Sequence, residues 1–189
     1  MAPVNVDERD IADLAALHVS CLSDSVTASL GARYLKSFYR YVTSSNKEIA
    51  LVERNNAGRI IAAVVVTLDI ASLNRRLLFH TSLLLDLIAH PRQMRSLVFA
   101  RDSGDGHELP EMILIYTSPH ERGRGHGTAL IDQAEQRMRQ RNIAEYQVKT
   151  VADPSNPALA FYRKKKFTPA GTSHTLGRDF QVFTRRLDS

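Results

Sequence analysis

Residues 111–131 read EMILIYTSPHERGRGHGTALI, and this stretch decides the fold class. The apolar run Met112–Thr117 has the length and composition of a buried strand, and Ser118-Pro119 ends it. Three glycines follow within five residues, and apolar residues then recur at helical spacing from about residue 127 to 141. The sequence therefore predicts a strand, a glycine-rich turn and an amphipathic helix in direct succession.

The glycine-rich turn has the chemistry of a phosphate site. Glycines adopt positive φ and bring successive N–H groups toward one point, and a helix start adds the positive end of its dipole. A Walker A loop would need a lysine before Thr128, and a dinucleotide loop would need glycine at position 128. The turn thus favours a phosphate ligand other than a nucleoside triphosphate or NAD. The alternative is a turn that binds nothing, which the flanking Arg122 and Arg124 make the weaker reading.

Working outward, strand and helix patterns alternate on both sides of this stretch. Asp7 is a candidate helix cap, and Asn55-Asn56-Ala57-Gly58 is typical of a hairpin turn. These patterns predict an α/β (α+β) domain. The expected strands are 4–6, 48–54, 59–68, 112–117, 147–151 and 180–187, and the expected helices are 11–22, 30–43, 127–141 and 156–165.

Length and composition fit one globular domain over residues 1–189. With 43% apolar and 24% charged residues, the chain can bury a core of its own. Cys21 is the single cysteine, so an intramolecular disulfide is excluded and a cytoplasmic location is expected. The sequence contains no run of about 18 apolar residues, so no membrane span is expected. The net charge of +5 fits an anionic ligand, an anionic surface or nucleic acid.

Two motifs resemble those of the GCN5-related N-acetyltransferase (GNAT) family. The first is Arg122-x-x-Gly125-x-Gly127, which is similar to the loop that holds the pyrophosphate of acyl-coenzyme A in that family. The second is the segment 155–167, which is similar to the family's Asn-led helix that ends in a tyrosine and then Gly-Phe. Here Lys166 stands at the position of that glycine. The resemblance is strong over residues 110–167.

This resemblance implies a GNAT fold, with a mixed sheet of about six to seven strands flanked by helices. It also implies acetyl-CoA as co-substrate and direct transfer of the acetyl group to a primary amine in a ternary complex. Tyr162 would be the general acid for the coenzyme A sulfur, Glu111 the general base, and the Ile115 amide a donor to the oxyanion. The expected cofactor-binding residues are Ile115, Tyr116, Thr117, Arg122, Gly123, Arg124, Gly125, His126, Gly127, Thr128, Asn156 and Tyr162.

Other candidate groups receive weaker assignments. Fallback bases are His80, His107 and Glu108, and Glu111 itself could be no more than a solvated residue at the strand edge. The histidines show no metal-ligand spacing, so no metal is expected. The basic run 163–166 is either a solvated face or close to the coenzyme 3′-phosphate.

The acceptor is expected to be a small molecule, such as an amino sugar or an amine metabolite. It would bind between the loop 21–31, the region 174–179 and a basic, apolar, helical insert at about 71–100. That insert suits core helices, a lid over the acceptor or the face of a homodimer. Two rival functions remain open: a basic nucleic-acid-binding module, which lacks a recognised motif, and a catalytically idle acyl-CoA sensor.

Overall fold

The computed structural model describes residues 4–23, 25–79, 109–175 and 177–187. Most of the expected insert, from residue 80 to 100, lies outside this part of the chain. The fallback bases His80, His107 and Glu108 also lie outside it.

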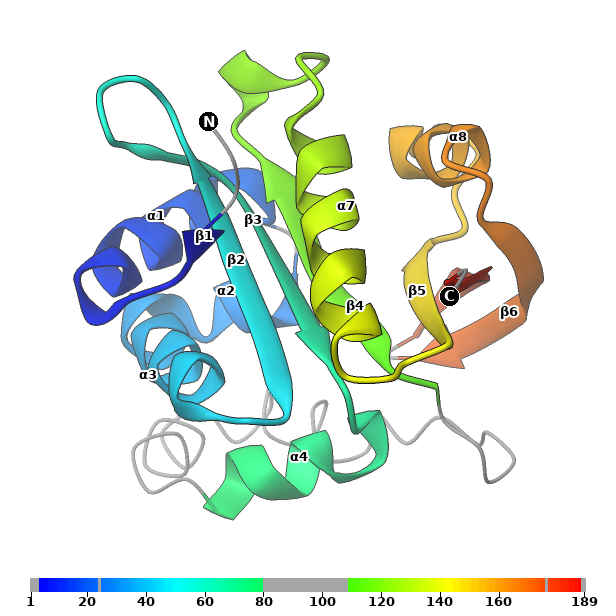
Figure 1. Cartoon of the computed structure of the whole chain (residues 1–189), viewed down its shortest axis with the longest axis horizontal. Coiled ribbons are helices and arrows are strands. Elements are labelled where there is room, and N and C mark those ends of the chain that lie inside the picture. The colour runs from blue at the N-terminus through cyan, green and yellow to red at the C-terminus, as the bar shows by residue number, and fades with distance from the viewer. Residues whose placement is uncertain (1–3, 24, 80–108, 176, 188–189) are drawn as a thin grey trace.

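A seven-stranded mixed sheet organises the molecule, in the order β1-β2-β3-β4-β5-β7-β6 (Figure 1). Only β4 and β5 pair in parallel, whereas every other neighbouring pair is antiparallel. The predicted mixed sheet is therefore confirmed. The strands are β1 (Val4–Asn5), β2 (Glu48–Arg54), β3 (Ile60–Thr67), β4 (Glu111–Thr117), β5 (Glu145–Val151), β6 (Thr168–Thr175) and β7 (Arg178–Arg186).

Helices cover both faces of this sheet (Figure 1). Asp7 forms a capping box with Asp10 at the start of the first helical segment, so the expected cap is present. The helix after the glycine turn ends at Arg139, two residues before the predicted end. The helical segments are η1 (Glu8–Asp10), α1 (Ile11–Cys21), α2 (Val26–Ser29), α3 (Gly31–Ser44), α4 (Ile70–Phe79), η2 (Pro119–Glu121), α7 (His126–Arg139) and α8 (Pro157–Lys164).

The sheet separates two apolar cores. One core packs α1, α3 and α4 against one face, and the other packs α7 and α8 against the opposite face. Strand β3 contributes to both, because side chains alternate along a strand: Ala63 and Val65 enter the first core, and Val64 and Val66 the second. A strand buried on both faces reads as a continuous apolar run, as this one does.

Helix α4 begins the region between β3 and β4 and is tied to the sheet through Arg76. The guanidinium of Arg76 lies 2.6 Å from a carboxylate oxygen of Glu48 on β2 and 3.0 Å from one of Asp69. It also donates a hydrogen bond of 2.8 Å to the Tyr41 hydroxyl on α3. Since the Glu48 side chain is fully buried, Arg76 supplies the positive charge that this carboxylate needs.

The strands β4 and β5 separate soon after they begin. They pair only at Glu111 with Gln147 and at Met112 with Val148. The register of β4 against β3 shifts at the same level, because Val66 pairs with Met112 and Val65 with Leu114. Ile113 is therefore the extra residue of a β-bulge, which bends β4 away from its parallel neighbour. The sheet is left open between these two strands.

Candidate active site

The edge of β4 that faces the opening carries backbone groups that β5 does not pair. The N–H of Ser118 donates to the carbonyl of Ile61 on β3 at 2.8 Å. Because N–H groups alternate between the two edges of a strand, the N–H of Ile115 and the groups of Thr117 point to the opposite edge. The Thr117 carbonyl follows this expectation, since the Cys21 thiol lies 3.6 Å from it. The geometry thus supports Ile115 as an amide donor inside the opening.

The glycine-rich turn leads from the end of β4 into α7 and presents free N–H groups. Gly123 and Gly125 have φ of 77° and 91°, in the left-handed region that favours glycine. Gly125 is the N-cap of α7, where no side chain supplies a capping hydrogen bond. The first helical bond runs from Ala129 to the Gly125 carbonyl, so the N–H groups of residues 126–128 have no acceptor within the helix. N–H groups of this kind at the start of a helix can bind an anion.

The side chains of the glycine-rich turn contact other groups of the protein. His126 contacts β2, with its Nδ1 2.9 Å from a carboxylate oxygen of the buried Glu53. Arg124 is exposed and pairs with Glu121 at 2.9 Å, and Arg122 donates to the Thr117 carbonyl at 3.4 Å. The two arginines therefore stand at the surface beside the anion site, where they can turn to a bound diphosphate.

Tyr162 lies on α8 in an aromatic cluster. Its ring centroid is 5.4 Å from that of Phe161, 5.2 Å from Phe167 and 5.7 Å from Phe183. Only 3% of the residue is exposed, and this burial raises the pKa of the phenol well above its usual value. The hydroxyl therefore keeps its proton at neutral pH and remains a donor.

Asn156 is the N-cap of α8, and its amide is already engaged. The side-chain oxygen accepts from the N–H of Ala158 at 3.0 Å. The side-chain nitrogen donates to the Thr150 hydroxyl at 2.9 Å and to the Val151 carbonyl at 2.8 Å. These bonds join the start of α8 to the end of β5 and so fix the helix that carries Tyr162.

Glu111 lies where β4 and β5 still pair, at the narrow end of the opening. The residue is 8% exposed, and its Oε2 accepts a hydrogen bond of 2.8 Å from the Gln147 side chain. The Lys149 ammonium on β5 is 3.4 Å from the same oxygen. Sequence patterns alone offered no signal for these two partners, because they lie more than thirty residues further along the chain.

The Tyr116 side chain points away from the cofactor side and into the core beneath α1 and α3. Its hydroxyl lies 2.7 Å from that of Tyr39, which lies 2.7 Å from Nδ1 of His18. Nε2 of His18 lies 3.0 Å from the Thr27 hydroxyl of α2. A contact of Tyr116 with the expected acetyl-CoA would therefore use its backbone, while its side chain links β4 to α2 through Tyr39 and His18.

His18 is the functional candidate that the sequence analysis passed over. Its side chain is fully buried, and desolvation lowers its pKa from 6.5 to about 4, so the ring is neutral at physiological pH. A neutral imidazole accepts at one nitrogen and donates at the other, which suits a bridge between two hydroxyls. The signal in the sequence was a histidine on the apolar face of α1. Such a histidine more often has a structural role in the core than a functional one.

No group of three metal-ligating side chains occurs within the described residues. In the same part of the chain, no helix combines the length and the apolar character that crossing a bilayer requires.

Comparison with known proteins gives the class. The model of the acetyltransferase (GNAT) family matches residues 24–167, which is most of the chain. The chain belongs to this family. It is therefore an acetyltransferase that uses acetyl-CoA, as the two motifs implied. A search of curated proteins gave no match.

Solved structures agree with the fold at low sequence identity. A putative GNAT acetyltransferase from Desulfovibrio desulfuricans has a TM-score of 0.65 at 10% identity, covering 99% of this chain and 100% of that one. PaiA N-acetyltransferase from Thermoplasma acidophilum, in complex with coenzyme A, has a TM-score of 0.57 at 14% identity, with 97% of both chains covered. The ribosomal-protein-S18-alanine N-acetyltransferase of Escherichia coli has a TM-score of 0.62 at 12% identity, covering 99% and 94%.

Proposed function

We propose that this acetyltransferase moves the acetyl group of acetyl-CoA to a primary amine of a small molecule, and that residues 1–189 form its single catalytic domain. The observation that carries the proposal is the continuity between two features: the unpaired edge of β4 and the N–H groups that converge at the start of α7. One extended ligand with a diphosphate and an amide-bearing arm would satisfy both.

In this proposal the turn binds the diphosphate of the coenzyme. The N–H groups of residues 126–128 would donate to its oxygens, and Arg122 and Arg124 would add positive charge at the rim. Backbone groups of Ile115 and Thr117 would then pair with the arm that enters the sheet in place of β5. The thioester would come to lie near the narrow end of the opening.

Three steps of the reaction fall to residues of this chain. Glu111 would take a proton from the acceptor ammonium, directly or through water, so that the free amine can attack the thioester carbonyl. The N–H of Ile115 would donate to the oxyanion that forms when the new C–N bond is made. When the C–S bond breaks, the thiolate would take a proton from the Tyr162 hydroxyl, and the second proton of the attacking nitrogen would return to that oxygen, directly or through water, as the amide forms.

The acceptor would enter from the side covered by α1, α2 and α3. The hydroxyls of Ser25 and Thr27 are part-buried there and lie close to His18, at 3.4 and 3.0 Å from its Nε2. Hydroxyls held in this way suit an acceptor that is itself rich in hydroxyl or amino groups, such as an amino sugar or an amine metabolite. A substrate panel should therefore include amino sugars, polyamines and an alanine-bearing peptide, because one structural neighbour is named a ribosomal-protein-S18-alanine N-acetyltransferase.

The test of the coenzyme site is Gly125→Trp, which places a large side chain where the N–H groups converge. Isothermal titration with acetyl-CoA should show binding to the wild type and none to this variant. Gly58→Trp is the matched control, because Gly58 also has a positive φ, of 76°, and open space around it, but lies in the β2–β3 turn. Equal affinity in Gly125→Trp and Gly58→Trp would refute the loop assignment. Release of free thiol with one member of the amine panel then identifies the acceptor class.

A further inference from the structure

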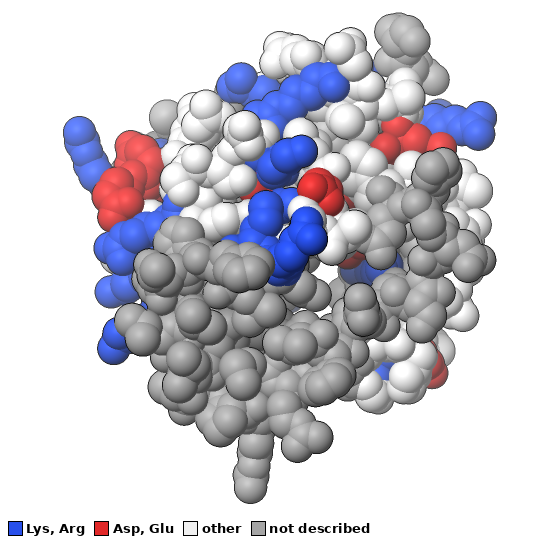
Figure 2. Space-filling view, turned by 90° about the horizontal axis from the view of Figure 1, so that it is seen from below, with Lys and Arg blue, Asp and Glu red and all other residues white. Residues whose placement is uncertain are grey.

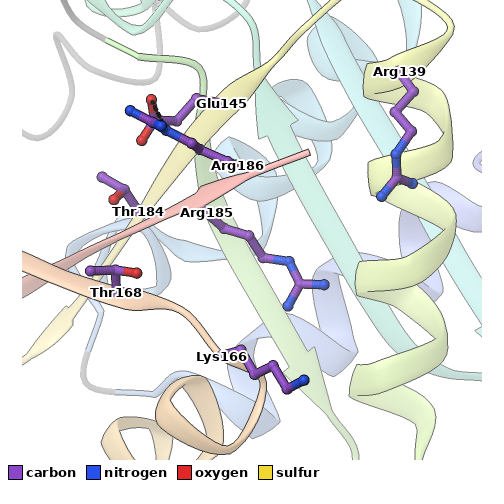
Figure 3. A pocket seen from close by; sticks show the side chains of 7 residues that line it. All are labelled: Arg139, Glu145, Lys166, Thr168, Thr184, Arg185 and Arg186. Atoms are coloured by element: carbon purple, nitrogen blue, oxygen red, sulfur yellow. Dashed lines mark ion pairs between the residues drawn. The ribbon is translucent and has the colours of Figure 1, made fainter. Parts of the chain in front are cut away.

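Basic side chains are unevenly distributed over this protein. On the face seen from below, several Lys and Arg side chains lie near the middle (Figure 2). A second concentration has no place in the acetyl-transfer site. It lines a cavity of about 560 Å³ beside the last turn of α7, between the start of β5 and the strands β6 and β7 (Figure 3). The lining residues are Arg139, Glu145, Lys166, Thr168, Thr184, Arg185 and Arg186.

This cavity has a surplus of positive charge. Four of its lining residues are cations, and Glu145 is the one acidic lining residue. The buried carboxylate of Glu135 lies behind them, 2.7 Å from Arg185 and 3.6 Å from Arg139. Arg186 contacts Glu145 at 3.7 Å. Among the lining residues themselves, cations outnumber carboxylates four to one, so the lining is positively charged.

The arginine at the centre of the cavity is held in place before any ligand arrives. Arg185 contacts Glu135, donates to the carbonyl of Lys165 and stacks over the Phe167 ring, 5.3 Å from its centroid. Because the guanidinium is already ordered, a ligand would not have to order it on binding.

Lys166 adds an observation of a different kind. Its φ is 61°, in the left-handed region where a lysine is disfavoured and where the similar family motif has glycine. Within the described chain it has no ion-pair partner, and in Figure 3 its side chain reaches toward the same cavity as Arg185. A residue kept in a disfavoured conformation is a sign of a role that glycine could not fill. The ammonium group is what lysine adds at this position.

We propose that this cavity is a second anion site, which binds a small molecule carrying two phosphate groups. Lysine and arginine supply charge-assisted hydrogen bonds, and the hydroxyls of Thr168 and Thr184 supply neutral ones, the combination that phosphate oxygens accept. The volume falls within the usual range for a small-molecule site and exceeds that of a single phosphate. The lining residues gather at one end of α7, which suits such a ligand better than an RNA strand, since RNA needs a groove that tracks its backbone.

The cavity is separate from the coenzyme site. The turn that would bind the coenzyme diphosphate begins α7, whereas Arg139 ends it. A helix of fourteen residues spans about 20 Å at a rise of about 1.5 Å per residue. Lys166, the last residue of the basic run 163–166, therefore lines a cavity at the other end of α7. The proposal does not depend on which amine the enzyme acetylates.

Inorganic pyrophosphate is the probe, titrated calorimetrically into the full chain. To exclude binding at the coenzyme loop, the titration uses the Gly125→Trp background as well as the wild type. We expect one equivalent to bind in the Gly125→Trp background, and any further equivalent in the wild type is assigned to the coenzyme loop. In the Gly125→Trp background, Lys166→Gln should lower the affinity about tenfold, because one charge-assisted contact is lost. Lys164→Gln removes the same charge from an exposed position outside the cavity and should leave the affinity within about twofold.

A further variant separates loss of binding from loss of folding. Lys166→Gly relieves the left-handed conformation, so its melting temperature should equal or exceed that of the wild type while pyrophosphate binding falls. The proposal is overturned if pyrophosphate does not bind, if the Lys166 and Lys164 variants weaken it equally, or if a single-stranded RNA binds through Lys166 while pyrophosphate does not. Unchanged acetyl-CoA affinity in the Lys166 variants would confirm that the two sites are distinct.

Discussion

Acid should destabilise this protein through His18, by an amount that the structure allows us to calculate. Burial lowers the pKa of this ring to about 4 in the folded chain, against 6.5 when it is exposed. Between these values the unfolded chain binds a proton that the folded chain excludes. The free energy of unfolding therefore falls as the pH falls from 6.5 to 4, and below 4 this contribution changes no further.

The expected magnitude follows from the two pKa values. Between pH 7 and pH 5 the His18 contribution to the free energy of unfolding should decrease by about 2 kcal/mol, and by about 3 kcal/mol in total at lower pH. The assay is urea unfolding at a series of pH values, compared between the wild type and His18→Gln. Glutamine removes the titration, so the variant should lose about 2 kcal/mol less than the wild type between pH 7 and pH 5.

The packing cost of His18→Gln lowers the free energy of unfolding equally at every pH. It therefore does not affect the comparison of how the two proteins' stabilities change with pH. His120→Gln is the control: the ring is exposed on η2, so this variant should follow the wild-type curve. Parallel curves for wild type and His18→Gln would show that the ring is not excluded from protonation, and the account of the His18–Tyr39–Tyr116 network would then be wrong.

Three further substitutions test the site and the fold. Tyr162→Phe should lower kcat by about a hundredfold or more, with acetyl-CoA affinity nearly unchanged, and an unaltered kcat would remove the hydroxyl from the acid role. Glu111→Gln should lower kcat and change its pH profile in steady-state assays, whereas an identical profile would exclude this carboxylate as the base. Arg76→Met leaves the buried Glu48 uncompensated and should cost about 3–5 kcal/mol in urea unfolding, while the exposed neighbour Arg75→Met should cost almost nothing.

Local sequence features were enough to predict the structure of residues 111–139. The strand, glycine turn and helix of residues 111–139 were predictable, because burial of an apolar run, positive φ at glycine and helical periodicity are properties of neighbouring residues. The phosphate chemistry of the turn follows from the same local groups. By contrast β6 was not predicted, since the segment Thr168–Thr175 is mostly exposed and lacks an apolar pattern; it is a strand because β7 pairs with it.

Only the tertiary structure decided how these parts meet. Local sequence patterns do not show where β5 leaves β4, that Tyr116 faces away from the opening, or that Lys149 lies beside Glu111. Each of these facts is a contact between segments that are distant in the chain, and it depends on register and on a single bulge at Ile113. Chemistry carried by adjacent residues can be read in the sequence, whereas chemistry that needs two strands to part appears only when the sheet has formed.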